Sequence, residues 1–415
     1  MTPPDNDAGR ASATIPAVPK ALSRRFATVL VAILAVLAAV SVGQGFLNAI
    51  RNSQDLQWSP VSLLAGGLNP YTIALQADSS NALMLYQVPP YLHILYIVIL
   101  PLGFLTFKAA AVCWAVVSIG LGILASYTIA RRCRLDHLQS AILLLLFICG
   151  TPFRNAIGNG QTSLVLLFLL AISWFQRDRA QSGVALAIAS AKYSFVPAVW
   201  LWLALERRFN LLLVGIAALI VGWLAFSALS HSSPAGTLLQ PFEVAGKYSL
   251  DGGVGDIMTA IRQAGLDLPL AYGVHASYLG ALFVTVIGFF VVWRRASVLD
   301  DACIFAALCI ASLLAFRHLA YDYVLLTPVL AVSFSVEGAA RWVLSGCVVY
   351  FWFCLKILDT LGVNTSGQGM VLLGLVVNCV LFCTVVWQPK AVHRRSYPED
   401  KLAPDDREAL SNGSV

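Results

Sequence analysis

An aspartate shortly after the first apolar run of the chain carries a side chain that can act as a general base. Asp55 lies about eight residues after an apolar run that ends near residue 47. A carboxylate close to a membrane surface can accept the proton of a nucleophilic hydroxyl group, although an ordinary solvated loop carboxylate is the alternative. Leucines at helical spacing follow Asp55, so we expect a short interfacial helix there, with Trp58 as its headgroup anchor.

Two further polar features interrupt apolar sequence. Lys192 stands in an apolar run with no acidic residue nearby in the sequence. A lysine inside a membrane is costly and predicts a functional partner such as a lipid phosphate; a side chain that snorkels to the interface is the alternative. The second feature, which we call the polar knot, is Arg317–Tyr323. Its His318 can donate hydrogen bonds to a phosphate. Alternatively, His318 caps a helix and Asp322 pairs with Arg317.

A third polar group, Gly158–Gln161, follows an apolar run. The amide side chains of Asn159 and Gln161 carry donors and acceptors that suit the hydroxyl groups of a sugar. A turn with a helix cap is the structural alternative.

The elements that must position these residues are membrane-spanning helices. Apolar residues make up 59% of the 415 and charged residues only 12%, against about 25% in a typical globular chain. A water-soluble fold of this size could not cover its surface with so few charges. The apolar content allows about ten to twelve helices of roughly 20 residues. We therefore predict an all-α polytopic membrane protein.

Short basic clusters between the apolar runs set the expected topology. Basic residues flanking the first span place the N-terminus in the cytoplasm. The first span covers about 27–47, and the other apolar runs are 91–107, 109–130, 138–153, 161–176, 181–205, 210–229, 275–293, 300–316, 320–336, 341–358 and 369–387.

All basic clusters can be cytoplasmic only under two conditions. The run 91–107 must dip into the outer leaflet or lie along it, and 181–205 must be a broken pair of short helices that meet near Lys192. Interrupted helices are tolerated in membranes where they line a cavity. The alternative is that one basic cluster is external.

This topology divides the chain into a cytoplasmic tail (1–26), a transmembrane domain (27–387) and a disordered cytoplasmic tail (388–415). Two long external segments result, 48–90 and 230–274. The basic residues do not form one continuous face, so we expect no nucleic-acid partner. Eight of the nine cysteines lie in or at the ends of apolar runs without a CxxC motif, which is typical of buried thiols rather than of a metal or disulfide site.

Several motifs of nucleotide and metal chemistry are absent from the sequence. It contains no phosphate-binding G-x-x-x-x-G-K-[ST] loop, no dinucleotide fingerprint and no H-E-x-x-H. Apart from Asp5-Asn6-Asp7 in the N-terminal tail, it contains no Asp-x-Asp that would hold a metal–nucleotide-sugar. We therefore expect neither a cofactor nor a metal.

The order of these motifs resembles a known family over about residues 27–387. The ordered features are an aspartate in the first external loop, Gly66–Gly67, Asn69–Pro70–Tyr71, Val88–Pro89–Pro90, Gly158–Gln161, Lys192 within AIASAKYSFVP, and His318 followed by Tyr321–Tyr323. Together they resemble glycosyltransferase family 87, the polyprenol-phosphate-mannose-dependent α-1,2-mannosyltransferase-like proteins of the C-type superfamily.

The resemblance implies a C-type glycosyltransferase fold whose first external loop packs over a cavity at the outer leaflet. It implies Asp55 as the catalytic base, with His318 beside the site. Independently of the resemblance, we expect the cations Lys192 and Arg317 to be partners of the donor phosphate. Members often have a tyrosine where this chain has Trp58, which leaves sugar preference less transferable. The expected sugar or acceptor contacts are Trp58, Tyr71, Asn159, Gln161, Tyr321 and Asp322.

The expected function is transfer of a hexose, with mannose favoured, from a polyprenyl-phosphate donor to a lipid- or glycan-linked acceptor at the outer leaflet of a bacterial plasma membrane. A lipid phosphate departs without needing a proton, so an inverting reaction needs only one base. The alternative is a secondary transporter or flippase of a sugar or lipid-linked sugar. A transporter would account for Lys192 and a broken helix pair, but less well for the two long external segments.

Overall fold

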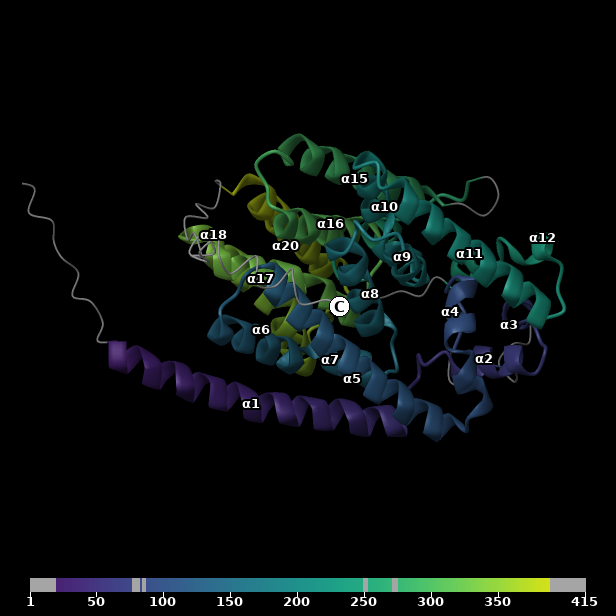
Figure 1. Cartoon of the computed structure of the whole chain (residues 1–415), viewed down its shortest axis with the longest axis horizontal. Helices are drawn as coiled ribbons and strands as arrows, with labels where there is room; N and C mark the ends of the chain where they lie inside the picture. Colours follow the sequence, from purple (N-terminus) through teal and green to yellow (C-terminus); the bar gives the residue numbers. More distant parts are fainter. Residues whose placement is uncertain (1–19, 77–82, 84–86, 249–252, 271–274, 389–415) are drawn as a thin grey trace, which may run out of the picture.

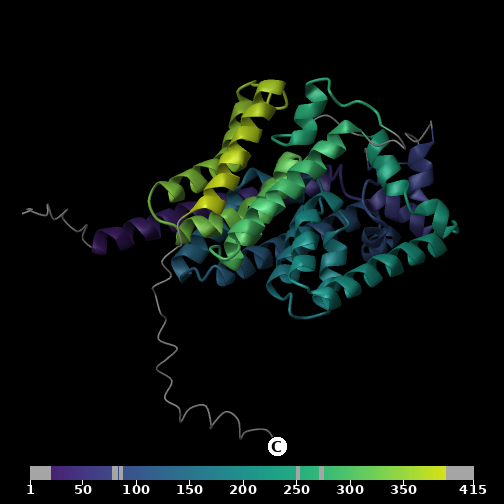
Figure 2. The ribbon, with the colours of Figure 1, turned by 90° about the horizontal axis from the view of Figure 1, so that it is seen from above.

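The chain folds into a bundle of helices. The computed structural model describes residues 20–76, 83, 87–248, 253–270 and 275–388, and within these ranges it contains helices and one isolated bridge but no β-strand. In Figure 1, α1 (Lys20–Arg51) runs along one edge of the molecule, and α2 (Trp58–Ala65), α3 (Pro70–Leu75) and α4 (His93–Val98) gather at the end where α1 stops. Seen from above in Figure 2, α1 passes behind the other helices.

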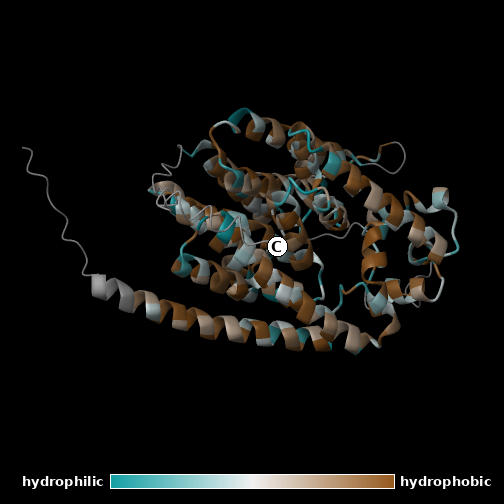
Figure 3. Cartoon of the chain, viewed as in Figure 1, coloured by the Kyte–Doolittle hydropathy of each residue, from teal (hydrophilic) through white to brown (hydrophobic). Residues whose placement is uncertain are grey.

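Within the described residues, six helices are long and apolar enough to cross a membrane, or seven if one bent pair counts as a span. Brown, hydrophobic residues predominate along α1 and α11, whereas teal collects at helix ends and connecting segments (Figure 3). The six are α1, α5 (Phe107–Arg132), α11 (Phe209–Leu229), α15 (Ala276–Arg295), α20 (Gln368–Trp387), and the continuous helix formed by α18 (Ala339–Val349), η6 (Tyr350–Cys354) and α19 (Leu355–Thr360). The bent pair is α6 (His137–Cys149) with α7 (Thr151–Gly158), at 52°. These helices confirm an all-α polytopic membrane protein.

In the part of the chain that the structure describes, the number of full-length spans is smaller than the ten to twelve expected from composition. Several apolar runs fold instead as shorter helices, namely α8 (Ser163–Phe175), α16 (Asp301–Ala315) and η5 (Ala320–Leu326) with α17 (Thr327–Ser335). In α16 every residue from Ala302 to Ala315 is buried. A helix covered on all sides by protein is apolar all round, so its sequence resembles that of a membrane span.

The run 181–205 is a broken pair of helices, as predicted from its basic ends. It consists of α9 (Ser182–Ala189), the short η3 (Tyr193–Phe195) and α10 (Pro197–Leu205), and Lys192 lies at the break. The run 91–107 is likewise not one helix, because it forms only α4 and the 3₁₀ turn η2 (Leu100–Phe104).

The two long segments predicted to be external pack against each other. The first begins later than predicted because α1 continues to Arg51. The Lys247 ammonium group donates to the carbonyl oxygens of residues 74, 75 and 76 at 2.9–3.1 Å, and the Asn69 amide donates to Gln240 at 3.0 Å. These bonds join α3 to α13 (Gln240–Lys247). The remaining helices of the second segment are α12 (Pro234–Thr237) and α14 (Ile257–Gln263).

The predicted tails fall mostly outside the described residues. Residues 1–19 and 389–415 are not described, and α1 already begins at Lys20, inside the predicted N-terminal tail of 1–26.

A close backbone contact holds the broken helix pair against α11. A Cβ atom on Gly183 would lie 2.2 Å from the carbonyl oxygen of Leu211 and 2.8 Å from the amide nitrogen of Gly215. Backbone atoms cannot yield as a flexible side chain can. We therefore predict that Gly183→Ala destabilises the detergent-solubilised protein by at least about 1–3 kcal/mol, measured as a lower thermal unfolding temperature.

Gly120→Ala is the matched control for this test. Gly120 lies within α5, and a methyl group added there would meet open space, with no atom within 4 Å. An unfolding temperature of Gly183→Ala equal to that of Gly120→Ala would contradict the close packing of α9 on α11.

Candidate active site

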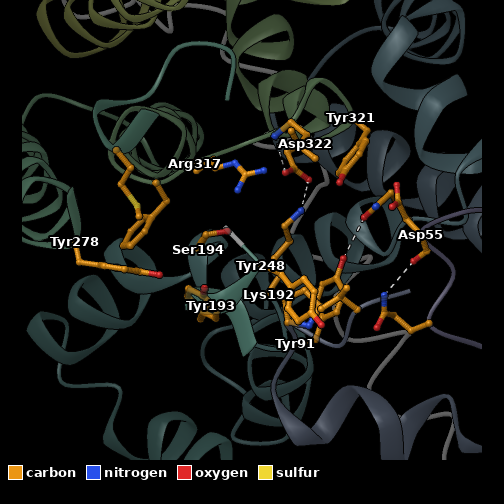
Figure 4. Close-up of a pocket in the computed structure, with 18 of the residues that line it drawn as sticks. Asp55, Tyr91, Lys192, Tyr193, Ser194, Tyr248, Tyr278, Arg317, Tyr321 and Asp322 are labelled. Atoms are coloured by element: carbon orange, nitrogen blue, oxygen red, sulfur yellow. Dashed lines mark hydrogen bonds and ion pairs between the residues drawn. The ribbon is translucent and has the colours of Figure 1, made fainter. Parts of the chain in front are cut away.

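A cavity of about 210 Å³ lies where the first loop, the broken helix pair and the polar knot meet. In Figure 4, Asp55 lies on one side of the view and Arg317 and Tyr278 on the other, with Lys192 and Asp322 between them. The lining residues are Asp55, Gln57, Val88, Pro90, Tyr91, Gln161, Lys192, Tyr193, Ser194, Ala245, Tyr248, Met258, Arg262, Tyr278, Phe316, Arg317, Leu319, Tyr321 and Asp322.

Asp55 is held at the cavity by the loop between α1 and α2. Its backbone N–H donates to the carbonyl oxygen of Asn159 at 2.9 Å. Gly160 has φ +72°, and a Cβ there would lie 2.7 Å from the Cβ of Leu56. The turn before α8 therefore packs directly on the Asp55 loop, and a glycine is needed both for the left-handed backbone and for the close approach.

Burial sets the proton affinity of Asp55. It raises the pKa of the Asp55 carboxyl, while a hydrogen bond with Gln161 and the positive charge of Lys192 lower it; the negative charge of Asp322 raises it further. The net shift is upward, because removal of water disfavours the charged carboxylate more than its partners favour it. Asp55 therefore binds a proton more tightly than an ordinary aspartate.

The Gly158–Gln161 turn reaches the cavity through one of its two amides. Gln161 lines the cavity, and its Oε1 accepts a hydrogen bond from the Tyr91 hydroxyl at 3.1 Å. The Trp114 indole N–H donates to the Gly160 carbonyl at 3.0 Å and fixes the turn from behind. Asn159 contributes its backbone carbonyl to Asp55 and does not line the cavity.

Lys192 has a buried carboxylate partner that lies 130 residues away in the sequence. Its Nζ is 2.6 Å from Oδ1 of Asp322, and the side chains are 16% and 2% exposed. The same Oδ1 accepts a hydrogen bond from the Ser163 hydroxyl at 2.6 Å. The Lys192 ammonium also lies 5.0 Å and 5.1 Å from the ring centroids of Phe195 and Tyr321. Asp322 thus pairs with Lys192.

His318 lies behind the cavity rather than on it. Its ring is fully buried, with Nδ1 3.3 Å from Oδ2 of Asp322 and Nε2 3.2 Å from the carbonyl oxygen of Ser312. The backbone turn that presents Arg317 and Asp322 to the cavity thus directs the intervening histidine into the core. His318 therefore contacts Asp322, which lines the cavity, and does not line it itself.

Two aromatic residues expected to contact sugar or acceptor also lie elsewhere. Tyr71 is fully buried and donates to the Tyr91 carbonyl at 2.6 Å, so its ring supports the wall of the cavity from outside. Trp58 donates to the Leu105 carbonyl at 3.0 Å and packs edge-on against Phe107. Trp58 thus ties the first loop to the end of η2, and Tyr71 ties it to the segment before α4. Neither side chain lines the cavity.

Several lining residues were not identified from the sequence. Arg262 comes from α14 and is paired with Asp267 at 2.9 Å, and Tyr193 and Tyr278 come from η3 and α15. The only feature of the sequence that could have indicated Arg262 was its positive charge within the second external segment. The tyrosines gave none, because a tyrosine at a helix end is common at membrane interfaces.

The lining carries three cations, Lys192, Arg262 and Arg317, and two aspartates, Asp55 and Asp322. A net positive, partly apolar cavity suits an anionic substrate group. Among the described residues, no group of three or more His, Cys, Asp or Glu side chains is placed to hold a metal ion.

These features define a membrane-embedded protein with a cationic cavity and one carboxylate of raised proton affinity. The family model of Glycosyltransferase family 87 matches residues 91–320, more than half of the chain. The protein belongs to this family and is a membrane glycosyltransferase. The match includes Lys192 and the start of the polar knot, whereas Asp55 precedes it. Comparison with curated proteins and with solved structures gave no match.

The buried pair of Lys192 and Asp322 makes a prediction about stability. Removal of one partner leaves the other charge uncompensated, so we expect Asp322→Asn to cost about 3–5 kcal/mol in unfolding free energy. The double variant Lys192→Met/Asp322→Asn should recover part of that loss. Denaturant titration of the solubilised protein measures both values.

An exposed ion pair supplies the control. Lys356 and Asp359 are 2.6 Å apart but 49% and 53% exposed, so Asp359→Asn should change the unfolding free energy by less than about 1 kcal/mol. An equal loss of unfolding free energy in Asp322→Asn and Asp359→Asn would show that the buried pair stabilises the fold no more than the exposed pair does.

Proposed function

We propose that the protein is an inverting hexosyltransferase that uses a polyprenyl-phosphate-linked sugar, with mannose favoured. The acceptor is a lipid- or glycan-linked hydroxyl at the outer leaflet of a bacterial plasma membrane, and both chain termini are cytoplasmic. The observation that carries this proposal is that Asp55 lines the same cavity as Lys192 and Arg317. A base and two cations thus face one space, as attack by a hydroxyl group and departure of a phosphate require.

Asp55 is the general base of the proposed reaction. As the acceptor oxygen forms its bond to the anomeric carbon, its proton passes to the Asp55 carboxylate, and the bond between that carbon and the phosphate oxygen breaks on the opposite face. The leaving lipid phosphate carries its negative charge away and needs no proton. A raised pKa makes Asp55 a stronger base at neutral pH than an exposed aspartate would be.

Lys192 and Arg317 are the proposed partners of the donor phosphate. Both line the cavity, and in Figure 4 Lys192 lies between Asp55 and Arg317. Cations held in place before the reaction stabilise charge that develops on the phosphate without having to reorganise. Asp322 holds the Lys192 ammonium at 2.6 Å, and His318 supports the other oxygen of Asp322. We therefore assign Asp322 and His318 as positioning residues.

The sugar hydroxyls have candidate partners between these two ends. Gln161 and Tyr91 are linked by a hydrogen bond at 3.1 Å on the Asp55 side, and Tyr321 lies beside Lys192. Amide and phenol groups that already form part of a hydrogen-bond network can discriminate between sugars by the position of a hydroxyl group.

The test of the proposed function combines product analysis with one isosteric substitution. Purified protein is incubated with polyprenyl-phosphate-mannose and a membrane lipid extract, and mass spectrometry identifies any new glycosidic product. Asp55→Asn should retain donor binding but lower turnover by at least about a hundredfold, because general-base catalysis typically contributes about 10²–10⁴-fold.

Glu243→Gln is the matched control, since Glu243 is an exposed acid in the same group of packed segments and does not line the cavity. It should leave turnover unchanged. Turnover of Asp55→Asn within a few-fold of wild type would remove Asp55 as the base. Asp256, which is buried at the start of α14, would then be a candidate for the general base. Two other external acids, Asp78 and Asp251, lie outside the described residues.

The pH dependence of the reaction tests the coupling between these groups. Activity should be lost as the pH falls through the raised pKa of Asp55, because the protonated acid cannot accept a proton. The charge of Lys192 lowers that pKa, so Lys192→Gln should shift the acidic limb of kcat/KM to higher pH. The charge of Asp322 raises it, so Asp322→Asn should shift the limb to lower pH.

The pH profiles are measured at several donor concentrations, so that weaker donor binding by Lys192→Gln appears as a higher KM and is separated from the shift in the limb. Profiles of the two variants that move in the same direction would contradict the assignment of the limb to Asp55.

A further inference from the structure

A second cavity, of about 460 Å³, lies at the opposite end of the central helices. Three elements, α8, α16 and the continuous η5–α17, each have one end at the first cavity and the other at this one. The fifteen residues of α16 alone separate the two by about 22 Å. The residues that line the second cavity are Arg131, Arg132, Cys133, Arg134, Phe175, Arg177, Asp300, Asp301, Ala302, Cys303, Val332, Ser335, Val336 and Gln388.

The charge of this second cavity is positive. Four arginines and two aspartates give its lining a net charge of +2. Arg177 and Asp301 form an ion pair at 2.9 Å, and Asp300 caps the start of α16 by accepting from the Cys303 N–H at 2.8 Å. The arginines at the end of α5, in contrast, are exposed. The excess positive charge is therefore concentrated on the α5 side of the cavity.

The backbone at the end of α5 turns sharply at one of these arginines. Arg134 has φ +54°, in the left-handed region where glycine is favoured and another residue costs about 1 kcal/mol. Its N–H donates to the Arg131 carbonyl at 3.1 Å, and the Leu135 N–H donates to that of Ala130 at 3.1 Å, which closes the helix end. The turn brings Arg134 back to the same cavity as Arg132, whose guanidinium lies 5.8 Å from the Phe175 ring centroid.

Exposed aromatic residues surround this end of the bundle. Tyr127 lies one turn before Arg131, and its hydroxyl accepts a hydrogen bond from that guanidinium at 3.5 Å. Trp387 immediately precedes Gln388 of the cavity, and Trp342 follows Arg341, which donates to the Val336 carbonyl at 2.7 Å. These three side chains are 53%, 56% and 75% exposed. Exposed Tyr and Trp at helix ends are typical of the headgroup level of a bilayer.

We infer that the second cavity binds the phosphate of an anionic phospholipid headgroup. Guanidinium groups form paired, charge-assisted hydrogen bonds with phosphate oxygens, and basic pockets between membrane helices are suited to anionic headgroups. The headgroup-level aromatic residues and the apolar side chains of Phe175, Val332 and Val336 favour a lipid over a soluble phosphate, because an inorganic phosphate has no apolar part to contact them. This site is independent of the proposed sugar transfer.

The test measures lipid binding by the full-length protein in a non-ionic detergent. Native mass spectrometry compares added phosphatidylglycerol with phosphatidylcholine, and inorganic phosphate is added as a competitor in a separate series. The wild type should bind one phosphatidylglycerol more tightly than phosphatidylcholine. Arg132→Gln/Arg134→Gln should weaken that binding about twenty-five-fold, because each basic residue near an anionic lipid contributes roughly fivefold. Restoring charge as Arg132→Lys/Arg134→Lys should recover much of it.

The matched control is Arg207→Gln/Arg294→Gln, which removes two exposed arginines that do not line the cavity. It should bind phosphatidylglycerol as the wild type does. Equal weakening in both double variants would show a general charge effect and overturn the site. Displacement of the lipid by millimolar inorganic phosphate would assign the cavity to a soluble anion and overturn the lipid. Thermal unfolding of each variant without lipid separates loss of fold from loss of binding.

Discussion

The buried pair of Lys192 and Asp322 constrains the structure around it, because two charges taken out of water must be satisfied within the protein. Asp322 meets this requirement with contacts from three parts of the chain: the Lys192 ammonium, the Ser163 hydroxyl and the His318 ring. The break in the 181–205 helix pair, the start of α8 and the polar knot are therefore fixed relative to one another. The cavity is the space that this arrangement leaves between them.

The break between α9 and α10 gives Lys192 its freedom to reach that partner. In a continuous helix the lysine would lie among apolar neighbours on the helix surface, and the backbone carbonyl groups around it would all be hydrogen bonded within the helix. At the break, the Ala191 carbonyl instead accepts from the Leu92 N–H at 3.0 Å, so the segment before α4 satisfies it. The same bond brings Tyr91 to the cavity. Interrupted helices thus supply both the charge and part of the wall.

The two segments predicted to be external act as one unit. Lys247 on α13 binds the carbonyl oxygens at the end of α3, where a helix leaves its last carbonyl groups without partners inside the helix. Tyr248, the next residue, donates to the Ala74 carbonyl at 2.8 Å and also lines the cavity. The first segment carries Asp55 and the second carries Arg262, so their packing sets the distance between the two ends of the cavity.

Composition alone determined that this is a helical membrane protein, because a chain with only 12% charged residues cannot cover a water-exposed surface with polar side chains. The lone charge of Lys192 and the basic ends of its run also predicted a broken helix, since both follow from local cost in an apolar medium. Tertiary structure decided what the sequence could not. The partner of Lys192 lies 130 residues away, and apolar α16 is a buried core helix rather than a full span. His318 faces the core while its neighbours face the cavity. Pairing, burial and side-chain direction depend on which helices pack together, and that information is distributed over the whole chain.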